Sequence, residues 1–174
     1  GIRQVAPICL PHLQILVAPG DLRSALEPML DECGLPAGSM RELMVCDITD
    51  LVNAFALITG SERVDLRLEH IDHDACWRFH IDIVETRLLT TYLGPATEWG
   101  QPVYAEQAIN EQKNFSGPIE RRCRDDVAIF KGGNAARGSG IVHRSPRLKG
   151  TGNKRLLLCL NKQSEVSPDP WDKR

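Results

Sequence analysis

Apolar positions recur at helical spacing early in the chain and at alternate positions later. The clearest helical stripe consists of Met40, Met44, Ile48, Leu51, Phe55 and Ile58. Ser39 and Glu42, just before most of this stripe, have the spacing of a capping box, in which each side chain bonds a free backbone N–H at the helix start. Gly60 follows the stripe, where a helix commonly ends. The pattern predicts an amphipathic helix over residues 40–59, of about five turns by its length.

A shorter helix is expected before this one. Leu22, Leu26 and Leu30 recur at helical spacing, but Pro28 lies inside the pattern. Proline removes a backbone donor and clashes with the preceding turn, so we expect the helix to be broken or kinked there. Residues 1–20 contain three prolines and are expected to form an irregular arm with room for one strand.

From residue 63 onward apolar and polar residues alternate, which predicts strands. We expect strands over residues 64–68, 77–83, 87–93, 126–130, 140–143 and 155–160. Helical runs followed by strands are typical of an α+β fold with a sheet sandwich or barrel. We expect one domain over residues 1–174, with residues 1–60 mainly helical, residues 61–162 forming the β core and residues 163–174 forming a tail.

Residues 131–140 form a glycine-rich stretch between two of the expected strands. Gly133 and Gly138 have the outer spacing of a phosphate loop, but Ser139 stands where that loop needs a lysine. A strand rather than a helix is expected to follow, which also departs from a phosphate loop. The stretch therefore predicts a mobile hairpin or lid.

Charge is distributed unevenly, although the formal net charge is −2. Residues 1–112 hold 7 basic and 17 acidic side chains, whereas residues 113–155 hold 11 and 3. Either the two parts attract each other across one fold, or the basic stretch faces an anionic ligand. A pI of about 6.2 and only Phe115 and Phe130 as aromatics in the basic stretch disfavour a nucleic-acid partner.

The six cysteines are scattered and form no C-x-x-C pair. This pattern is typical of reduced, mostly buried thiols rather than of a disulfide framework, and it favours a cytoplasmic protein. The composition, 42% hydrophobic and 25% charged, is that of an ordinary globular chain. No apolar run approaches the roughly 20 residues of a membrane span, so we expect no membrane partner.

The histidines and one aspartate suggest a metal site. His80 and Asp82 are two apart on an expected strand, so their side chains point to one face. His143, at the end of a later expected strand, is the obvious third ligand. Two imidazoles and one carboxylate on one face of an ion leave positions open for substrate and oxygen, as non-haem Fe(II) oxygenases require. The alternative is that His80 and Asp82 simply hydrogen-bond in a polar patch.

A second cluster competes with this one for a metal ion. His70 and His73 lie close in sequence to Asp72, Asp74 and Cys76, all of which can be metal ligands. The stretch His70-Ile-Asp-His-Asp74 is more typical of a polar turn between two strands. We therefore expect the metal at the first cluster.

Five motifs together resemble the Fe(II)/2-oxoglutarate dioxygenase superfamily. They are His80-Ile-Asp82, Arg87-Leu-Leu-Thr-Thr-Tyr92-Leu93, Asp126-Val-Ala-Ile-Phe130-Lys-Gly132, His143-Arg144 and Lys154-Arg155. More closely, the stretch from His80 through Gly94-Pro-Ala-Thr-Glu-Trp99 to His143-Arg144-Ser145-Pro146 resembles a bacterial family, domain of unknown function 1826. That resemblance covers roughly residues 50–162.

The superfamily resemblance implies a fold and a metal. The fold is a double-stranded β-helix, a jelly-roll or cupin-like core, with the N-terminal helices packed outside it. The metal is Fe(II), held by His80, Asp82 and His143, with 2-oxoglutarate as co-substrate. The resemblance further implies oxidation of a small-molecule or peptide substrate.

The same resemblance implies residues for the co-substrate. Arg155, with Arg147 as the second choice, would pair with the far carboxylate of 2-oxoglutarate. Apart from the resemblance, Tyr92 and Thr90 face one side of their expected strand, from which they would hydrogen-bond ligand oxygens. Each of these residues has an ordinary alternative as a packed or solvated side chain.

Two other classes of protein stay open at this point. The same three ligands with one water would suit Zn(II) and hydrolysis, with Glu85 or Glu98 as the general base. Alternatively, the chain would bind or sequester a metal without turnover.

Overall fold

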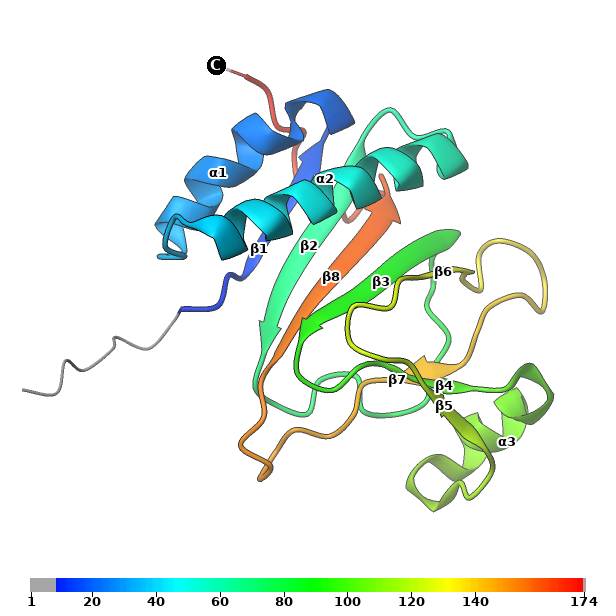
Figure 1. The fold of residues 1–174 in the computed structure, drawn as a ribbon. Helices are drawn as coiled ribbons and strands as arrows, with labels where there is room; N and C mark the ends of the chain where they lie inside the picture. The colour runs from blue at the N-terminus through cyan, green and yellow to red at the C-terminus, as the bar shows by residue number, and fades with distance from the viewer. Residues whose placement is uncertain (1–8, 174) are drawn as a thin grey trace, which may run out of the picture.

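The computed structural model describes residues 9–173, and their strands form two antiparallel sheets (Figure 1). The larger sheet has the order β1 (Leu13–Val17), β2 (Val64–Ile71), β8 (Arg155–Lys162), β3 (Thr86–Leu93) and β6 (Ala128–Lys131). The smaller sheet has the order β5 (Ile119–Arg121), β4 (Glu98–Gly100) and β7 (His143–Arg144). Together with the helices, these sheets give the α+β organisation that the sequence predicts.

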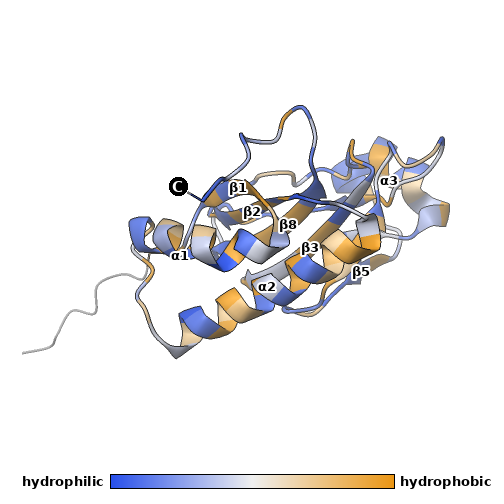
Figure 2. Cartoon of the chain, turned by 90° about the horizontal axis from the view of Figure 1, so that it is seen from above, coloured by the Kyte–Doolittle hydropathy of each residue, from blue (hydrophilic) through white to orange (hydrophobic). Residues whose placement is uncertain are grey.

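Three α-helices accompany the sheets in the described part of the chain. α1 (Leu22–Glu32) and α2 (Ser39–Thr59) lie across one face of the larger sheet, and α3 (Ala105–Glu111) lies beside the smaller sheet (Figures 1 and 2). Short 3-10 turns occupy Pro19–Asp21, Pro102–Tyr104 and Gln112–Asn114. None of the described helices is long and apolar enough to cross a membrane.

The central strand β8 separates two apolar layers. Leu156, Leu158 and Leu160 belong to the core between the larger sheet and helices α1 and α2. Leu157 and Cys159 point the other way, into a second cluster that includes residues of both sheets. A strand buried on both faces reads as a nearly continuous apolar run, which explains why β8 shows little alternation in the sequence.

α2 begins and ends close to where the sequence predicts, but it is capped and rotated differently. Gly38 is its N-cap residue and makes no side-chain cap bond, so the expected capping box of Ser39 and Glu42 does not form. The expected stripe is also wrong in part, because Met40 is 78% and Ile58 is 66% exposed. The buried positions are Arg41, Val45, Ile48, Val52, Phe55 and Ala56.

Arg41 fixes the face that α2 presents to α1. Its guanidinium donates to the Asp31 carboxylate at 2.7 Å and to the Glu27 carboxylate at 2.6 Å, and it is 7% exposed. α1 runs unbroken from Leu22 to Glu32 with Pro28 inside it, so the expected break does not occur. The paired Arg41 explains how a charged residue occupies the helix interface.

The chain between β2 and β3 differs from the expected strand over residues 77–83. Only His80 in this stretch forms a bridge, and its partner is His143. Residues 1–20 were expected to form an irregular arm with one strand. β1 is that strand, so this part of the expectation is confirmed. Residues 1–8 of that arm lie outside the described residues, as does residue 174 of the expected tail.

The cysteines are unpaired in the structure, as their scattered positions predict. Their burial differs from the expectation, because Cys159 alone is buried. Cys33 is half-buried and the other four are exposed. The position of Cys159 on the central strand, rather than any general property of thiols, accounts for its burial.

Candidate metal centre

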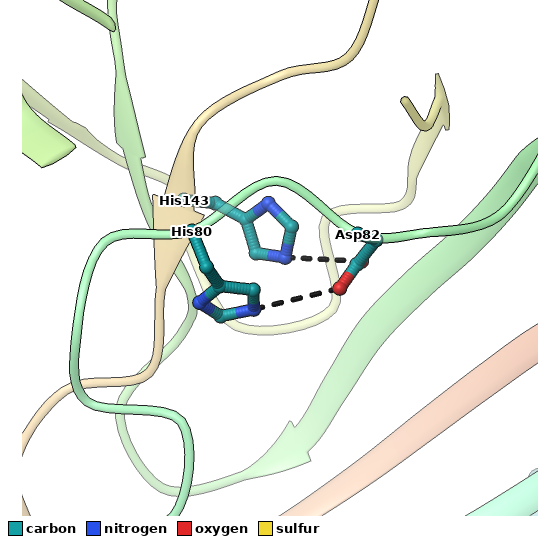
Figure 3. Close-up of side chains that lie close together, drawn as sticks. All are labelled: His80, Asp82 and His143. Carbon is teal, nitrogen blue, oxygen red and sulfur yellow. Dashed lines mark ion pairs between the residues drawn. The ribbon is translucent and has the colours of Figure 1, made fainter. Parts of the chain in front are cut away.

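Two stretches of chain bring three metal-ligating side chains together. His80 and His143 exchange backbone hydrogen bonds of 3.0 Å in both directions, which places the start of β7 beside the stretch that carries Asp82. The ligand atoms of His80, Asp82 and His143 all lie within 4.8 Å of one another. In Figure 3 both imidazoles face the Asp82 carboxylate. We call these three residues the trio.

Both histidines are oriented by backbone carbonyls. His80 Nδ1 lies 2.7 Å from the carbonyl oxygen of Arg78, and His143 Nδ1 lies 2.9 Å from that of Ile141. A ring nitrogen bonded to a carbonyl must carry the proton, so each Nε2 is left with a free lone pair in the neutral ring. His80 Nε2 and His143 Nε2 lie 3.4 and 3.2 Å from the Asp82 oxygens.

Asp82 is a charged group in a largely buried place. Burial by itself would raise the pKa of its carboxyl, but the adjoining imidazoles of His143 and His80 and the charge of Arg87 hold that pKa well below its usual range. The same carboxylate raises the pKa of His80, while burial of the ring opposes this. Asp82 is therefore ionised at neutral pH, which is the form that binds a metal.

The two oxygens of Asp82 have different surroundings. Asp82 Oδ2 is buried and forms an ion pair with Arg87 Nη1 at 2.8 Å, whereas Oδ1 faces His80 Nε2. Two imidazole nitrogens and a carboxylate oxygen are ligands that suit Fe(II) or Zn(II). This donor set fits a divalent metal ion.

Aromatic rings surround His143 on its other sides. The ring centroids of Trp99 and Phe130 lie 5.1 and 5.2 Å from that of His143, and Trp99 and Phe130 meet edge to face at 5.0 Å. Trp99 comes from β4 and Phe130 from β6, so both sheets contribute. This packing fixes the ring of His143, which is 4% exposed.

The glycine-rich stretch fastens the segment that carries Asp82. Gly133 N donates to the Asp82 carbonyl at 2.8 Å, and Gly132 N donates to the Glu85 carbonyl at 3.0 Å. A Cβ on Gly132 would lie 2.2 Å from the Val84 carbonyl oxygen, so only glycine permits this approach. The expected mobile lid is thus, at its base, a support that fixes the backbone of Asp82.

A cavity of about 320 Å³ opens beside the trio. All three members of the trio line it, and its floor comes from the inward face of the larger sheet. The other residues that line it are His12, Arg67, Glu69, His70, Ile71, His73, Ala75, Cys76, Arg87, Leu89, Thr97, Ser145, Leu157 and Cys159. Its volume lies at the low end of the range for small-molecule sites.

Arg155 lies behind the wall of this cavity, bonded to two residues that line it, and is fully buried. It donates to Ser145 Oγ at 2.7 Å, to Thr97 Oγ1 at 2.9 Å and to Thr91 Oγ1 at 3.2 Å. No carboxylate of the described residues lies within ion-pair distance of it, and its Nε has no hydrogen-bond partner there. Burial lowers the pKa of Arg155 to about 10, so the group is charged at neutral pH.

A family model described as protein of unknown function (DUF1826) matches residues 2–161. The chain belongs to the DUF1826 family. No curated protein and no solved structure matches it. The family match includes all three members of the trio and Arg155.

The structure of this DUF1826 protein does not bring every expected ligand-binding residue to the trio. Tyr92 belongs to the core under α1 and α2, and its hydroxyl donates to Asp47 on α2. Thr90 pairs in register with Leu158 and so shares the same helix-facing side. Arg147 is bound to Asp74 at 3.0 Å and does not line the cavity. None of the four expected co-substrate residues lines the cavity, but Arg155 is bonded to Ser145 and Thr97, which do.

The competing cluster around His70 is not assembled in this DUF1826 protein. In the described part of the chain only the trio brings three ligand atoms together. Asp74 accepts hydrogen bonds from the backbone of Leu148 and Lys149, so its role is to fix a loop. This matches the expected polar turn.

Neither general base proposed for a hydrolase lies in the cavity. Glu85 is bound to Lys162 at 2.9 Å, and Glu98 is bound to Arg121 at 2.8 Å and to Arg144 at 2.7 Å. The cavity-lining carboxylate outside the trio is Glu69. Sequence reasoning did not single out Glu69, nor Thr91, Thr97 and Ser145, since nothing in their spacing sets them apart from other polar residues.

Proposed function

We propose that this DUF1826 protein is a non-haem Fe(II)- and 2-oxoglutarate-dependent oxygenase that acts on a small-molecule or peptide substrate. One observation carries the proposal: a two-histidine, one-carboxylate trio lines a cavity, and a buried arginine without an acidic partner, Arg155, is bonded to two other residues of the same lining. Fe(II) on such a trio, when bound, supplies oxidative chemistry and keeps positions open for a 2-oxo acid and oxygen.

The trio would hold the metal in a fixed orientation. The carbonyls of Arg78 and Ile141 keep the proton on Nδ1 of each histidine, so that both Nε2 atoms face the ion. Arg87 holds the second oxygen of Asp82, which favours coordination of the metal through one oxygen. These contacts exist before any ion binds, so the ligands are preorganised.

Arg155 would bind the far carboxylate of 2-oxoglutarate. Its hydroxyl partners Ser145 and Thr97 line the cavity and orient the guanidinium without neutralising it. A buried guanidinium is costly unless an anion compensates it. Gly94 supports this arrangement, because a Cβ there would lie 2.1 Å from the Lys154 carbonyl oxygen, next to Arg155.

The path of the chain supports a double-stranded β-helix as the fold behind this chemistry. After β2 the chain enters the smaller sheet at the His80 bridge and returns to the larger sheet in β3. It then passes through β4 and β5 in the smaller sheet, β6 in the larger, β7 in the smaller and β8 in the larger. Such alternation between two facing sheets is typical of a jelly roll. A cytoplasmic setting, in keeping with the free cysteines, is part of the proposal.

Metal loading comes first in the test. Purified protein is loaded with Mn(II) without oxygen, and bound metal is measured after gel filtration. The His143→Ala variant should lose most of its metal, because one of three ligands is gone, while His73→Ala should keep it. Equal loss in both variants would remove the trio as the metal site.

Calorimetric titration of 2-oxoglutarate into the Mn(II)-loaded protein then tests the co-substrate. We expect binding, and we expect Arg155→Met to weaken it by about 30-fold or more, because loss of a buried charge pair costs about 2 kcal/mol or more. Arg147→Met is the matched control and should bind as the native protein does. No binding at millimolar 2-oxoglutarate, with metal bound, would leave a hydrolase or a simple metal-binding protein in its place.

A further inference from the structure

The buried polar atoms without a hydrogen-bond partner gather around one cavity. In the described part of the chain these atoms are Arg67 Nε, His70 Nε2, Asp82 Oδ2 and Arg155 Nε. Three of these residues line the cavity beside the trio, and the fourth is bonded to two residues that line it. A buried polar atom without a partner costs free energy, so these atoms mark places where a ligand completes the structure.

Two of the four atoms already have a use. Asp82 Oδ2 is paired with Arg87, and the proposed function assigns Arg155 to the co-substrate. Arg67 and His70 remain, and both belong to β2, but His70 pairs in register with Leu156 on the helix-facing side. Arg67 pairs in register with Cys159, which lines the cavity, so the two side chains share the inward face of the larger sheet.

The chemistry of Arg67 calls for an anion. A guanidinium has only donors, and its planar fork binds a carboxylate through two parallel hydrogen bonds. The nearest carboxylate to Arg67 in the described residues is that of Asp65, 3.6 Å from Nη2, and it leaves Nε unbonded.

The floor of the cavity between Arg67 and the trio is apolar. Cys159 on β8 lies between Arg67 on β2 and Leu89 on β3 in the strand register. Leu157 and Ile71 extend this apolar floor. Two strand spacings, roughly 10 Å, therefore separate Arg67 from the strand whose Arg87 holds Asp82.

Charge also favours an acid. With a divalent ion on the trio, the positive groups that line the cavity are the ion, Arg67 and Arg87. The negative groups are Glu69 and Asp82, so the lining carries net positive charge. This excess would attract an anionic molecule.

We infer that the organic substrate is a small carboxylic acid. Its carboxylate binds Arg67, and its hydrocarbon part lies over Cys159 and Leu89 and reaches the trio. This inference rests on the proposed function and names its substrate class. Arg67 is a substrate-binding residue in it, distinct from Arg155.

The first experiment uses the native full chain loaded with Mn(II) and saturated with 2-oxoglutarate, without oxygen. Hexanoate, the uncharged hexanamide and hexyl phosphate are titrated separately. We expect hexanoate to bind at least tenfold more tightly than hexanamide. We also expect Mn(II) to broaden the methyl proton signal of bound hexanoate more than the signal of the protons beside its carboxylate. Tighter binding of hexyl phosphate, the reverse broadening, or no binding of hexanoate would each overturn the inference.

The second experiment compares Arg67→Gln with Arg124→Gln, an exposed arginine that serves as the control. Arg67→Gln should weaken hexanoate at least tenfold and leave the affinity for 2-oxoglutarate unchanged, whereas the control should change neither. If Arg67→Gln instead weakens 2-oxoglutarate, the residue belongs to the co-substrate and the inference is wrong.

Failure of the proposed function gives a different result. In that case 2-oxoglutarate does not bind the native Mn(II)-loaded protein at all. Hexanoate is then titrated into the protein with Mn(II) alone. Binding that Arg67→Gln weakens would support the acid-binding site by itself, and absence of binding would overturn it.

Discussion

Thr90 and Thr91 are neighbours on β3 with opposite surroundings. Thr91 pairs in register with Leu157 on the cavity side and accepts a hydrogen bond from Arg155 at 3.2 Å. Thr90 pairs with Leu158 on the helix side. Because side chains alternate along a strand, a shift of one residue decides whether a threonine serves the site or the core.

This pair offers a matched test at the scale of one residue. Thr91→Val should weaken 2-oxoglutarate binding several-fold, since a net hydrogen bond contributes about 0.5–1.5 kcal/mol and Arg155 loses one of its anchors. Thr90→Val should leave that affinity unchanged. Calorimetry on the Mn(II)-loaded variants measures both. Equal effects would mean that Thr91 has no particular role in orienting Arg155.

The sequence could nominate the trio but not the groups around it. His80, Asp82 and His143 stand out because histidines are few and two of the three residues are two apart. The contact between Arg87 and Asp82 depends on a loop that leaves β2 and returns to β3, and no local pattern encodes that path. The expectation that Thr90 and Tyr92 lie at the site is wrong, because the sequence does not show which face of β3 points to the cavity. That face depends on how β3 packs between the helices and the smaller sheet.

At the scale of elements, α2 shows the limit of periodicity. Leu43 and Leu57, outside the expected stripe, are also apolar, and they are 65% and 85% exposed. Because α2 has apolar residues on several sides, its sequence is compatible with more than one choice of buried face. The ion pairs of the buried Arg41 with Glu27 and Asp31 help set the angle, and a hydropathy pattern counts arginine as a surface residue.

The ends of α2 can be tested with two substitutions. Ser39→Ala should change the free energy of unfolding by less than about 0.5 kcal/mol, because Ser39 is the first helical residue and not a cap. Gly60→Ala should destabilise by about 1 kcal/mol, because Gly60 ends the helix in the left-handed region with a φ of 64°. Urea unfolding measures both. If Ser39→Ala lowers the free energy of unfolding more than Gly60→Ala does, the capping box of Ser39 and Glu42 forms after all.

At the scale of the whole molecule, the uneven distribution of charge along the chain is matched by ion pairs in the structure. Carboxylates of the acidic part pair with arginines of the basic part: Asp74 with Arg147, and Glu98 with both Arg121 and Arg144. These pairs support the interpretation that the two parts attract each other across one fold. The separate interpretation, a basic stretch that faces an anionic ligand, stays a prediction, and Arg155, bonded to cavity-lining Ser145 and Thr97, is its candidate residue.

The ion pairs of Glu98 with Arg144 and Arg121 can be tested by measuring stability as a function of pH. Burial tends to raise the pKa of its carboxyl, but Arg144 and Arg121 outweigh this and lower the pKa below the ordinary 4.5. A lowered folded-state pKa adds stability above pH 4.5, and this stability is lost as the pH falls through the folded-state value. The native protein should therefore be more stable than Glu98→Gln at pH 7, with the difference shrinking below about pH 4.5. Urea titrations at pH 3–7 measure it, and a constant difference would contradict the assignment.

The single bridge between His80 and His143 has a consequence for the life of the protein in a cell. Residues 72–85 have no other strand pairing, so an ion held by the trio would act as a crosslink that closes a long loop of chain. Without the ion, this stretch would be the first place to open to a protease. Molecules that never receive their metal would then be degraded sooner than loaded ones, so the trio would also govern how long each copy survives.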